Sequence, residues 1–304
     1  MIKGKELKIS ILSAVFNEAD FIDEMIDSVI AQTEDQWELL LVDDGSTDDT
    51  VSRIQTRARG EERVVLVCHG EKLGKVQAFN RAFQASSGDV VVLLGGDDRL
   101  PEDSLSVRAA ALSRATDRRQ AKAAAFRLRT FSADPRFHNL VLPKSGKGNL
   151  SGGTIALTRP LAEQIFPIPR QLVAEDIWIA EVIRALEPSV INSPEIVLEY
   201  RIHQGNSNPR HLPFRQMTAS LHDRALPYQI LLETDRYQLD STVSKRLQQR
   251  VELEELRFRG KIWAILRLSS VPLTERLRAL STAHPAAFWL RRRFYALFSG
   301  LGSS

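Results

Sequence analysis

Cysteine is almost absent from this sequence: Cys68 is the single one among 304 residues, so no disulfide can form within one chain. Cys68 ends an apolar run, where a small buried side chain is the simplest interpretation. No apolar run approaches the roughly 20 residues that span a bilayer. Residues 1–8 are polar and lead into an apolar run too short for a secretion signal. These absences argue against a disulfide scaffold and a membrane-spanning protein, and they predict a cytoplasmic location.

Net charge is small, with 41 Lys and Arg residues against 38 Asp and Glu residues, but the charges are unevenly distributed. Residues 1–209 contain 25 basic and 30 acidic side chains, whereas residues 210–304 contain 16 basic and 8 acidic ones. The C-terminal part is therefore expected either to face an anionic partner, such as a phospholipid or an acidic glycan, or to present an ordinary solvated helical surface.

Short apolar runs without polar alternation occur at 9–15, 39–42, 64–68 and 90–94. They are typical of strands that are buried on both faces. Apolar residues between the runs recur at helical spacing. Alternation of strands and helices predicts an α/β fold with a mostly parallel central sheet.

The pattern changes after residue 100. We expect a helix at 101–114, a strand at 123–130, a polar loop at 144–153, a helix at 175–186 and a strand at 195–203. Beyond residue 209 the spacing is helical and interrupted by prolines. The sequence thus predicts a catalytic domain at 1–209, with halves at 1–100 and 101–209, and an α-helical appendage at 210–304.

Acidic side chains follow three of the predicted strands. Glu18 follows the first, Asp44 ends the second, and Asp97 and Asp98 follow the fourth. The carboxyl ends of parallel strands meet at one edge of a sheet, where ligands bind. Converging carboxylates repel one another, so such a site usually holds a cation or a proton. Mg²⁺ or Mn²⁺ bound together with substrate phosphates is the natural partner, whereas zinc is disfavoured because no Cys/His ligand spacing is present.

Five segments together resemble family-2 nucleotide-sugar glycosyltransferases. The segments are SILSAVFNEADFI from Ser10, ELLLVDDGSTDDT, GDVVVLLGGDDRLPEDSL, SGGTIALTRP around Gly152, and AEDIW from Ala174, and YRIHQGNS from Tyr200 resembles the closing strand of that family. The resemblance extends from residue 8 to about 208. It implies a GT-A-type fold, a nucleotide-diphosphate sugar donor, a divalent metal and transfer with inversion at the anomeric carbon, as in the synthesis of bacterial-type cell-surface polysaccharides or glycolipids.

The resemblance also implies roles for single residues. Asp44 is expected to hydrogen-bond the nucleoside base, and the backbone at Ala14, together with Glu18, to line the same pocket. Asp97 and Asp98 are expected to contact the ribose and to bind Mn²⁺ or Mg²⁺. A UDP-sugar is favoured over a GDP- or dTDP-sugar.

Gly95 stands where the family usually has an acid. This difference leaves open whether Asp97 or Asp98 ligates the metal. His203 is a further candidate ligand, and Arg201, which shares one face of the last predicted strand with it, is a candidate for contact with pyrophosphate. Lys75, which follows a glycine at a helix start, could also reach phosphate.

Asp176 is the expected catalytic base. Inverting transfer requires one carboxylate to take the proton from an acceptor hydroxyl as that hydroxyl attacks. Asp176 also lies in the first turn of a predicted helix, where an acid has an ordinary stabilising role, and only the family resemblance favours catalysis over that interpretation.

Residues 285–298 combine aromatic side chains with three consecutive arginines. This composition is typical of a helix that lies on a membrane surface, at the inner face of the cell membrane here, and such contact would suit a lipid-linked acceptor as well as a glycan. Packing of the aromatics onto the catalytic domain is equally compatible with it. No recognised motif supports binding of nucleic acid.

Two other functions are compatible with parts of the sequence. A nucleotidyltransferase would need a Gly-rich basic loop after the first strand, and the loop at 16–20 is acidic and lacks glycine. A catalytically decayed nucleotide-sugar-binding subunit of a membrane-associated assembly would explain why Gly95 replaces the acid of the family. The presence of Asp176, the expected catalytic base, argues against this alternative.

Overall fold

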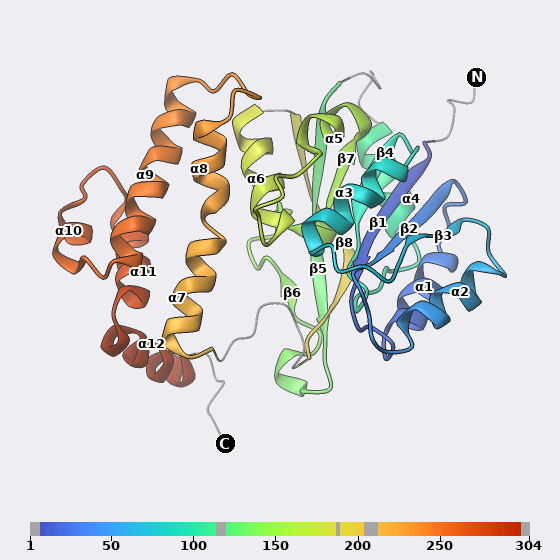
Figure 1. The fold of residues 1–304 in the computed structure, drawn as a ribbon, viewed down its shortest axis with the longest axis horizontal. Helices are drawn as coiled ribbons and strands as arrows, with labels where there is room; N and C mark the ends of the chain where they lie inside the picture. The colour runs from blue at the N-terminus through green and yellow to red at the C-terminus, as the bar shows by residue number, and fades with distance from the viewer. Residues whose placement is uncertain (1–6, 114–119, 187–188, 204–211, 299–304) are drawn as a thin grey trace. The chain divides into compact units, whose positions relative to one another are not determined.

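The computed structural model describes residues 7–113, 120–186, 189–203 and 212–298 (Figure 1). The chain divides between His203 and Gln204 into two compact units, unit 1 (residues 1–203) and unit 2 (residues 204–304). Unit 1 contains the strands and the helices that cover them, and unit 2 is helical in its described part. All of the candidate site residues named above belong to unit 1.

Unit 1 is built on a sheet of eight strands. They are β1 (Ile9–Val15), β2 (Trp37–Asp43), β3 (Val64–Cys68), β4 (Val90–Leu93), β5 (Lys122–Phe131), β6 (Val141–Leu142), β7 (Ile155–Thr158) and β8 (Ser189–Arg201). The order across the sheet is β3-β2-β1-β4-β7-β5-β6, and β8 also pairs with β5. The first four strands are parallel, β7 is antiparallel to β4 and β5, and β8 is parallel to β5.

Helices cover the faces of this sheet. They are α1 (Ile22–Ile30), α2 (Thr50–Ala58), α3 (Lys75–Ala85), α4 (Ser104–Ser113), α5 (Arg159–Ile165) and α6 (Glu175–Leu186), with short 3-10 turns η1 (Pro135–Phe137) and η2 (Gly152–Thr154). Apolar side chains of α1, α2 and α4 share one core cluster with alternate residues of β1, such as Ile9 and Ile11. Helix α3 packs on β1 and β2 through Val76 and Phe79, outside that cluster. Layers on both faces explain why the strands lack polar alternation.

Unit 2 consists of α7 (Phe214–Asp223), α8 (Leu226–Glu233), α9 (Ser241–Phe258), α10 (Ile262–Arg267), α11 (Leu273–Ala283) and α12 (Pro285–Phe298). Asp240 caps α9 by accepting hydrogen bonds from the backbone N of Thr242 and Val243, at 2.7 and 2.8 Å. A small core of Leu253, Ile265, Val271, Ala279 and Ala283 joins α9, α10 and α11. None of the described helices combines the length and the hydropathy that crossing a bilayer requires.

One local expectation needs correction. The last strand, β8, ends at Arg201, so His203 lies beyond the strand and not on it. The loop after β1 contains Asn17, which adopts a positive φ of 54° and whose Oδ1 accepts a hydrogen bond from the backbone N of Thr47 at 2.8 Å. Asparagine tolerates this left-handed conformation better than most residues, which explains its place in the loop after β1.

Candidate functional site

The carboxyl ends of β1, β2 and β4 lie at one edge of the sheet because these strands are parallel neighbours, with Val15 opposite Asp43. The loops that follow these strands contain Glu18, Asp44 and Asp97. Helices α3 and α6 add Lys75 and Glu175 at their first residues. The structure therefore gathers the acidic clusters at the edge where the sequence placed them.

Asp44 holds the loop between β3 and α3. Its Oδ1 accepts hydrogen bonds from the backbone N of Leu73 and Gly74, both at 2.6 Å, and its Oδ2 lies 3.0 Å from Lys72 Nζ. A nucleoside base that paired with Asp44 would have to share or displace these donors. The backbone of Ala14, on β1 beside Val42, is partly buried near the same end of the sheet.

Phe16 is a feature of this end of the sheet that the sequence interpretation missed. Its ring follows β1 directly, is 44% exposed, and lies 3.3 Å from Lys72 Nζ, measured to the ring centroid. An exposed aromatic face beside a cation is well suited to stacking against a planar ligand. A large aromatic residue immediately after the first buried strand was the available clue.

Asp97 and Asp98 converge on Gly95. A Cβ atom placed on Gly95 would lie 2.8 Å from Asp97 Oδ1 and 3.0 Å from Asp98 Oδ2, so the two carboxylates fill the space that an acid side chain at this position would need. Burial and the charge of Asp97 raise the pKa of Asp98 well above its ordinary value. A cation between the carboxylates would relieve that repulsion.

The donor set suits a divalent ion that is also bound by substrate. Two carboxylates and an imidazole, from Asp97, Asp98 and His203, are ligands that Mn²⁺ accepts. Among the described residues no three His, Cys, Asp or Glu side chains form a ready cluster for an ion. A metal held by these side chains would therefore need its remaining ligands from phosphate oxygens and water.

Arg201 orders the acid pair from β8. Its backbone N donates to Asp98 Oδ1 at 2.9 Å, and its Nε donates to the carbonyl oxygen of Asp97 at 2.7 Å. The guanidinium also pairs with Glu24 and lies over the rings of Phe21 and Phe131, with centroid distances of 4.6 and 4.3 Å. Contact with pyrophosphate, as expected from the sequence, would require this guanidinium to turn away from Glu24.

His203 reaches the same pair from beyond the end of β8. Its Nε2 lies 3.0 Å from Asp97 Oδ2, and its ring meets Phe21 edge to face at a centroid distance of 4.8 Å. The structure thus brings His203 to Asp97 although it is not a strand residue. A ring nitrogen so close to a carboxylate oxygen can either share a proton with it or ligate the same ion.

Glu18 faces the acid pair from the loop after β1. Its Cγ would lie 2.9 Å from a Cβ on Gly96, which shows how closely the two loops approach. Burial, with the charges of Asp97 and Asp48, raises the pKa of Glu18 to about 8, while Arg201 opposes the shift. Glu18 is therefore largely protonated at neutral pH when no cation is bound.

Lys75 links the donor side of the site to the start of α6. Its Nζ lies 3.0 Å from Glu175 Oε1. Burial opposes its charge, but Glu175, Asp176 and Asp97 outweigh this and raise the pKa of Lys75. Glu175 is 5% exposed, and its Oε2 is buried without a hydrogen-bond partner among the described residues. A buried acceptor of this kind is costly unless a bound hydroxyl or amine completes it.

Asp176 follows Glu175 in the first turn of α6 and is partly exposed. Its Oδ1 accepts a hydrogen bond from the backbone N of Ile177 at 2.9 Å. This oxygen therefore contacts the first turn of the helix, as expected for an acid that stabilises a helix start. The next residue but one, Trp178, is buried and donates from Nε1 to the carbonyl oxygen of Ile165 at 3.1 Å. This anchor fixes the start of α6, and with it Asp176, relative to α5.

Arg108 of α4 was not identified from the sequence. It is fully buried and donates to the carbonyl oxygens of Gly153, Ile155 and Val197 at 2.6, 3.0 and 3.2 Å. Burial lowers the pKa of Arg108 to about 9. Arg108 thus connects η2, within the SGGT segment, to β8. The sequence pattern of α4, with a single arginine, did not predict this role.

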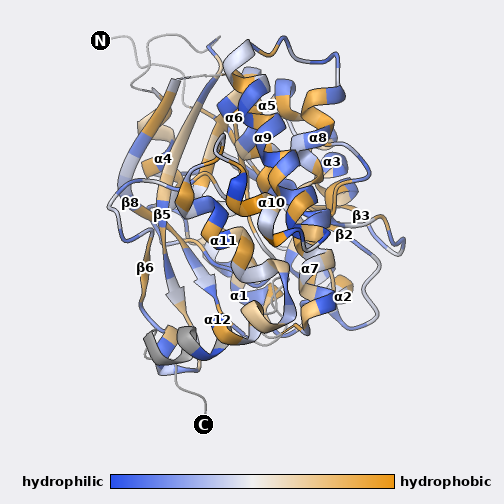
Figure 2. Ribbon diagram, turned by 90° about the vertical axis from the view of Figure 1, so that its left-hand side faces the viewer, coloured by the Kyte–Doolittle hydropathy of each residue, from blue (hydrophilic) through white to orange (hydrophobic). Residues whose placement is uncertain are grey.

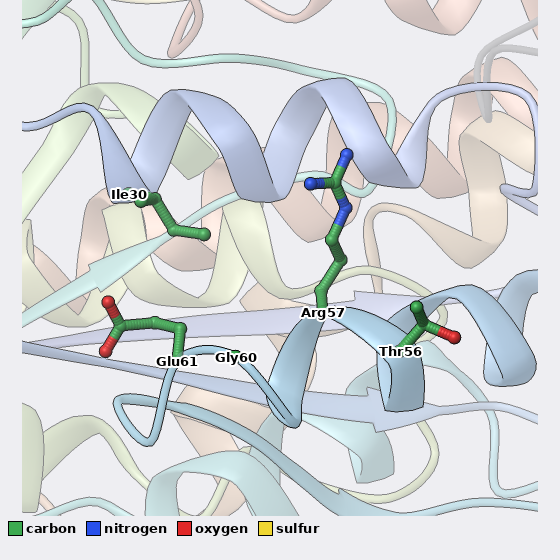
Figure 3. A pocket seen from close by; sticks show the side chains of 5 residues that line it. All are labelled: Ile30, Thr56, Arg57, Gly60 and Glu61. Carbon is green, nitrogen blue, oxygen red and sulfur yellow. The ribbon is translucent and has the colours of Figure 1, made fainter.

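A surface pocket of about 380 Å³ lies elsewhere in unit 1 (Figure 3). It is lined by Ile30 of α1, Thr56 and Arg57 of α2, and Gly60 and Glu61 of the turn before β3. The ends of these helices lead into β2 and β3, so the pocket lies at the edge of the sheet where the strands begin. It is separate from the acidic site.

Comparison with known proteins agrees with this geometry. Residues 10–166 match the model of glycosyl transferase family 2. The putative teichuronic acid biosynthesis glycosyltransferase TuaG of Bacillus subtilis is 33% identical over 97 residues, which are 32% of this chain and 38% of that protein. An undecaprenyl-phosphate 4-deoxy-4-formamido-L-arabinose transferase of Klebsiella pneumoniae is 31% identical over 102 residues, which are 32% of this chain and 31% of that protein. The chain thus spans less than two fifths of the length of these curated relatives.

Solved structures resemble almost the whole chain. TarS residues 1–349 of S. aureus, in complex with UDP-GlcNAc, gives a TM-score of 0.61 at 18% identity and covers 93% of this chain and 83% of its own. The mannosyltransferase PcManGT of Pyrobaculum calidifontis, in complex with GDP-Man and Mn²⁺, gives 0.57 at 20% identity, with coverage of 96% and 81%. The fold is the GT-A-like fold expected from the sequence. Because the family match covers more than half of the 304 residues, the protein belongs to glycosyl transferase family 2.

Proposed function

We propose that this protein transfers a sugar from a nucleotide-diphosphate sugar to a hydroxyl acceptor, with inversion at the anomeric carbon. The observation that carries the proposal is the ion pair between Lys75 Nζ and Glu175 Oε1, at 3.0 Å, directly before Asp176 in the chain. Asp176 and Asp97 both lie close enough to Lys75 to help raise the pKa of that lysine. A carboxylate suited to act as a base and an acid pair suited to a metal therefore share one small region at the edge of the sheet.

Asp176 takes the proton from the acceptor hydroxyl in this proposal. The acceptor oxygen forms a bond to the anomeric carbon on the face opposite the nucleoside diphosphate, and the bond from that carbon to the phosphate oxygen breaks. The electron pair leaves with the diphosphate. Lys75 places positive charge close to Asp176 and, in this proposal, to the departing phosphates.

Asp97, Asp98 and His203 are the residues that would hold Mn²⁺ or Mg²⁺. The ion supplies compensation for the charge that develops on the leaving diphosphate. Glu18 is then expected to lose its proton, because a nearby cation favours the carboxylate. Arg201 holds the backbone of Asp97 in place for the same purpose.

A UDP-sugar is the donor that we favour, with Asp44, Phe16 and the backbone at Ala14 around the base. The structural neighbours with UDP-GlcNAc and GDP-Man support a nucleotide-sugar donor in general. We place the catalytic domain at residues 1–209, with a donor half at 1–100 and an acceptor half at 101–209. The names of the relatives, which refer to teichuronic acid biosynthesis and to an undecaprenyl-phosphate acceptor, support a role in cell-surface polysaccharide or lipid-linked synthesis.

Donor binding and turnover test the proposal separately. Calorimetry with UDP-, GDP- and dTDP-sugars, with and without Mn²⁺, should give metal-dependent binding of a UDP-sugar, and donor hydrolysis should follow. Asp176→Asn should lower turnover at least about a thousandfold with donor affinity unchanged. The matched control is Asp103→Asn, an exposed carboxylate before α4, which should behave as the wild-type protein. Normal turnover in Asp176→Asn would refute the base.

Gly95 favours one alternative, a nucleotide-sugar-binding subunit without catalysis. It predicts the same calorimetric binding but no turnover with any donor, and no effect of Asp176→Asn. Failure of all nucleotide sugars to bind would contradict both functions.

A further inference from the structure

We propose that unit 2 docks on an anionic phospholipid bilayer through the outer side of α10 and α11. We define this bilayer face by four apolar side chains, Trp263, Leu266, Leu273 and Leu277. The inference goes beyond the proposed transfer reaction, and it assigns membrane contact to a segment different from residues 285–298.

The four side chains are unusually exposed for their size. Trp263 is 73% exposed, Leu273 is 56% exposed and Leu277 is 54% exposed. Leu266 is also exposed. Isolated apolar residues on a surface need no explanation, but four large ones on two short consecutive helices do. Tryptophan and leucine are the side chains that interfacial helices insert among lipid headgroups.

The inner sides of the same helices are fully used for packing. Ile265 of α10 and Ala279 and Ala283 of α11 belong to the small core of unit 2. Leu273 and Leu277 are four residues apart and therefore share one stripe of α11. The exposed residues are thus the outward sides of helices whose inward sides already hold the unit together.

The two helices present one continuous surface. Arg276 Nη1 donates to the carbonyl oxygen of Leu266 at 2.6 Å, so the end of α10 touches the turn of α11 that also contains Leu273 and Leu277. Helices α10 and α11 lie next to each other on the side of unit 2 that faces the viewer in Figure 2, where apolar and hydrophilic segments alternate.

Positive charge surrounds this surface. Residues 261–293 contain seven Lys and Arg residues and one acid, Glu275. That acid is compensated by Arg250, whose Nη2 lies 3.0 Å away. Lys261, Arg267 and Arg278 are exposed beside the apolar side chains. Apolar insertion within a basic rim is complementary to a negatively charged lipid surface.

A second copy of the chain is a weaker candidate for the same surface. Two copies would bring their basic rims together, and like charges across an interface oppose association. A bilayer with anionic headgroups has no such penalty. The charge therefore selects the bilayer as the occupant.

Vesicle sedimentation of the full chain, without donor or metal, tests the docking independently of the transfer reaction. The vesicles contain either phosphatidylcholine alone or phosphatidylcholine with 30% phosphatidylglycerol. We expect binding to the anionic vesicles, weakened by salt, and at least tenfold less binding to the neutral ones. Absence of binding to anionic vesicles would overturn the proposal, whatever the outcome of the donor assays.

Two variants test the face itself. Trp263→Ser with Leu273→Ser should reduce partitioning to anionic vesicles by at least about tenfold, since it removes two inserted side chains. Replacing Lys261, Arg267 and Arg278 with glutamine should reduce it about a hundredfold, from about fivefold for each cation near an anionic surface. All five residues are exposed, so thermal unfolding should be nearly unchanged, which separates lost docking from lost folding.

A charge-matched control separates the face from the net charge. Glutamine at Arg59, Lys144 and Lys147 removes three exposed cations from unit 1 and should leave vesicle binding nearly unchanged. Equal losses in both triple variants would overturn the proposal in favour of unspecific attraction. Concentration-dependent dimerisation that Trp263→Ser abolishes would overturn it in favour of a second copy. Loss of binding only in a Trp289→Ser variant would return the contact to residues 285–298.

Discussion

Replacing Glu18 with glutamine is expected to stabilise the metal-free protein at neutral and alkaline pH. Burial, followed by the charges of Asp97 and Asp48, raises the pKa of Glu18 to about 8 from an ordinary value of 4.5. Between these values the folded protein keeps a proton that the unfolded chain releases. The folded state is therefore favoured at acidic pH, and this contribution is lost as the pH rises towards 8.

The magnitude follows from the two pKa values. Each pH unit between them costs the wild-type fold roughly 1.4 kcal/mol, which would reach roughly 5 kcal/mol above pH 8. Glu18 is partly exposed, so solvent screening reduces this figure by about half. Glu18→Gln, which cannot ionise, should exceed the wild-type free energy of unfolding by about 1–2 kcal/mol at pH 7 and about 2–3 kcal/mol at pH 8.5. Near pH 4.5 the two proteins should be similarly stable.

Urea denaturation in the presence of a chelator measures the difference at pH 4.5, 7 and 8.5. Glu102→Gln makes the same chemical replacement at an exposed carboxyl and should show no such pH-dependent gain. In an Asp97→Asn background the gain from Glu18→Gln should shrink, because one source of the raised pKa has been removed. A stability difference that stays constant across this pH range would refute the assignment of a half-buried, protonated Glu18.

Three further substitutions test the packing of unit 1. Lys75→Met should lower the free energy of unfolding by about 1–3 kcal/mol, because it leaves buried Glu175 without its cation. Adding Glu175→Gln should recover part of this loss, and strict additivity of the two changes would contradict the coupling. Gly88→Ala places a Cβ 2.7 Å from the carbonyl oxygen of Lys8 and from the backbone N of Ser10, and it should cost about 3 kcal/mol in urea denaturation. Gly60→Ala, with its nearest atom at 3.7 Å, should cost little, and equal losses would contradict the clash. Arg108→Lys should destabilise more than Arg108→Met, since lysine keeps a buried charge but loses the planar fork, and the reverse order would show that hydrogen bonding outweighs charge burial.

The parallel half of the fold could be predicted because each of its strands is a local pattern. Burial on both faces requires an unbroken apolar run, and β1, β2 and β4 coincide with such runs. The antiparallel insertion of β7 between β4 and β5 could not be predicted, because its four residues resemble any short buried segment. Pairing partners depend on contacts between distant segments, which periodicity does not encode.

The end of β8 illustrates the same limit at the site. Alternation of polar and apolar residues continues through His203, but the strand ends at Arg201. Arg201 pairs with Phe131, which is the last residue of the partner strand β5. A strand lasts only as long as its neighbour can offer hydrogen bonds. The composition of the segment predicted a strand, and the length of β5 decided where it stopped.

Several site residues owe their state to partners that lie far away in the sequence. Arg201 is 177 residues from Glu24 and 104 residues from Asp97, yet it contacts both. The sequence placed Arg201 near phosphate because arginine is a common ligand for anions. In the structure the guanidinium of Arg201 already pairs with the carboxylate of Glu24 and lies over the rings of Phe21 and Phe131. Residue type alone therefore predicts which chemistry is available, whereas the packing of the neighbours decides how much of it is free for a substrate.

Gly95 shows how such packing changes the meaning of a missing residue. By sequence alone, the loss of an acid from the metal motif weakens the case for a metal. In the fold, Asp97 Oδ1 and Asp98 Oδ2 point at the place that a side chain at Gly95 would occupy. Two carboxylates already crowd this space, and burial together with the charge of Asp97 raises the pKa of Asp98. A third acid would add repulsion without adding room for an ion, so glycine at this position is compatible with a metal site made by the remaining pair.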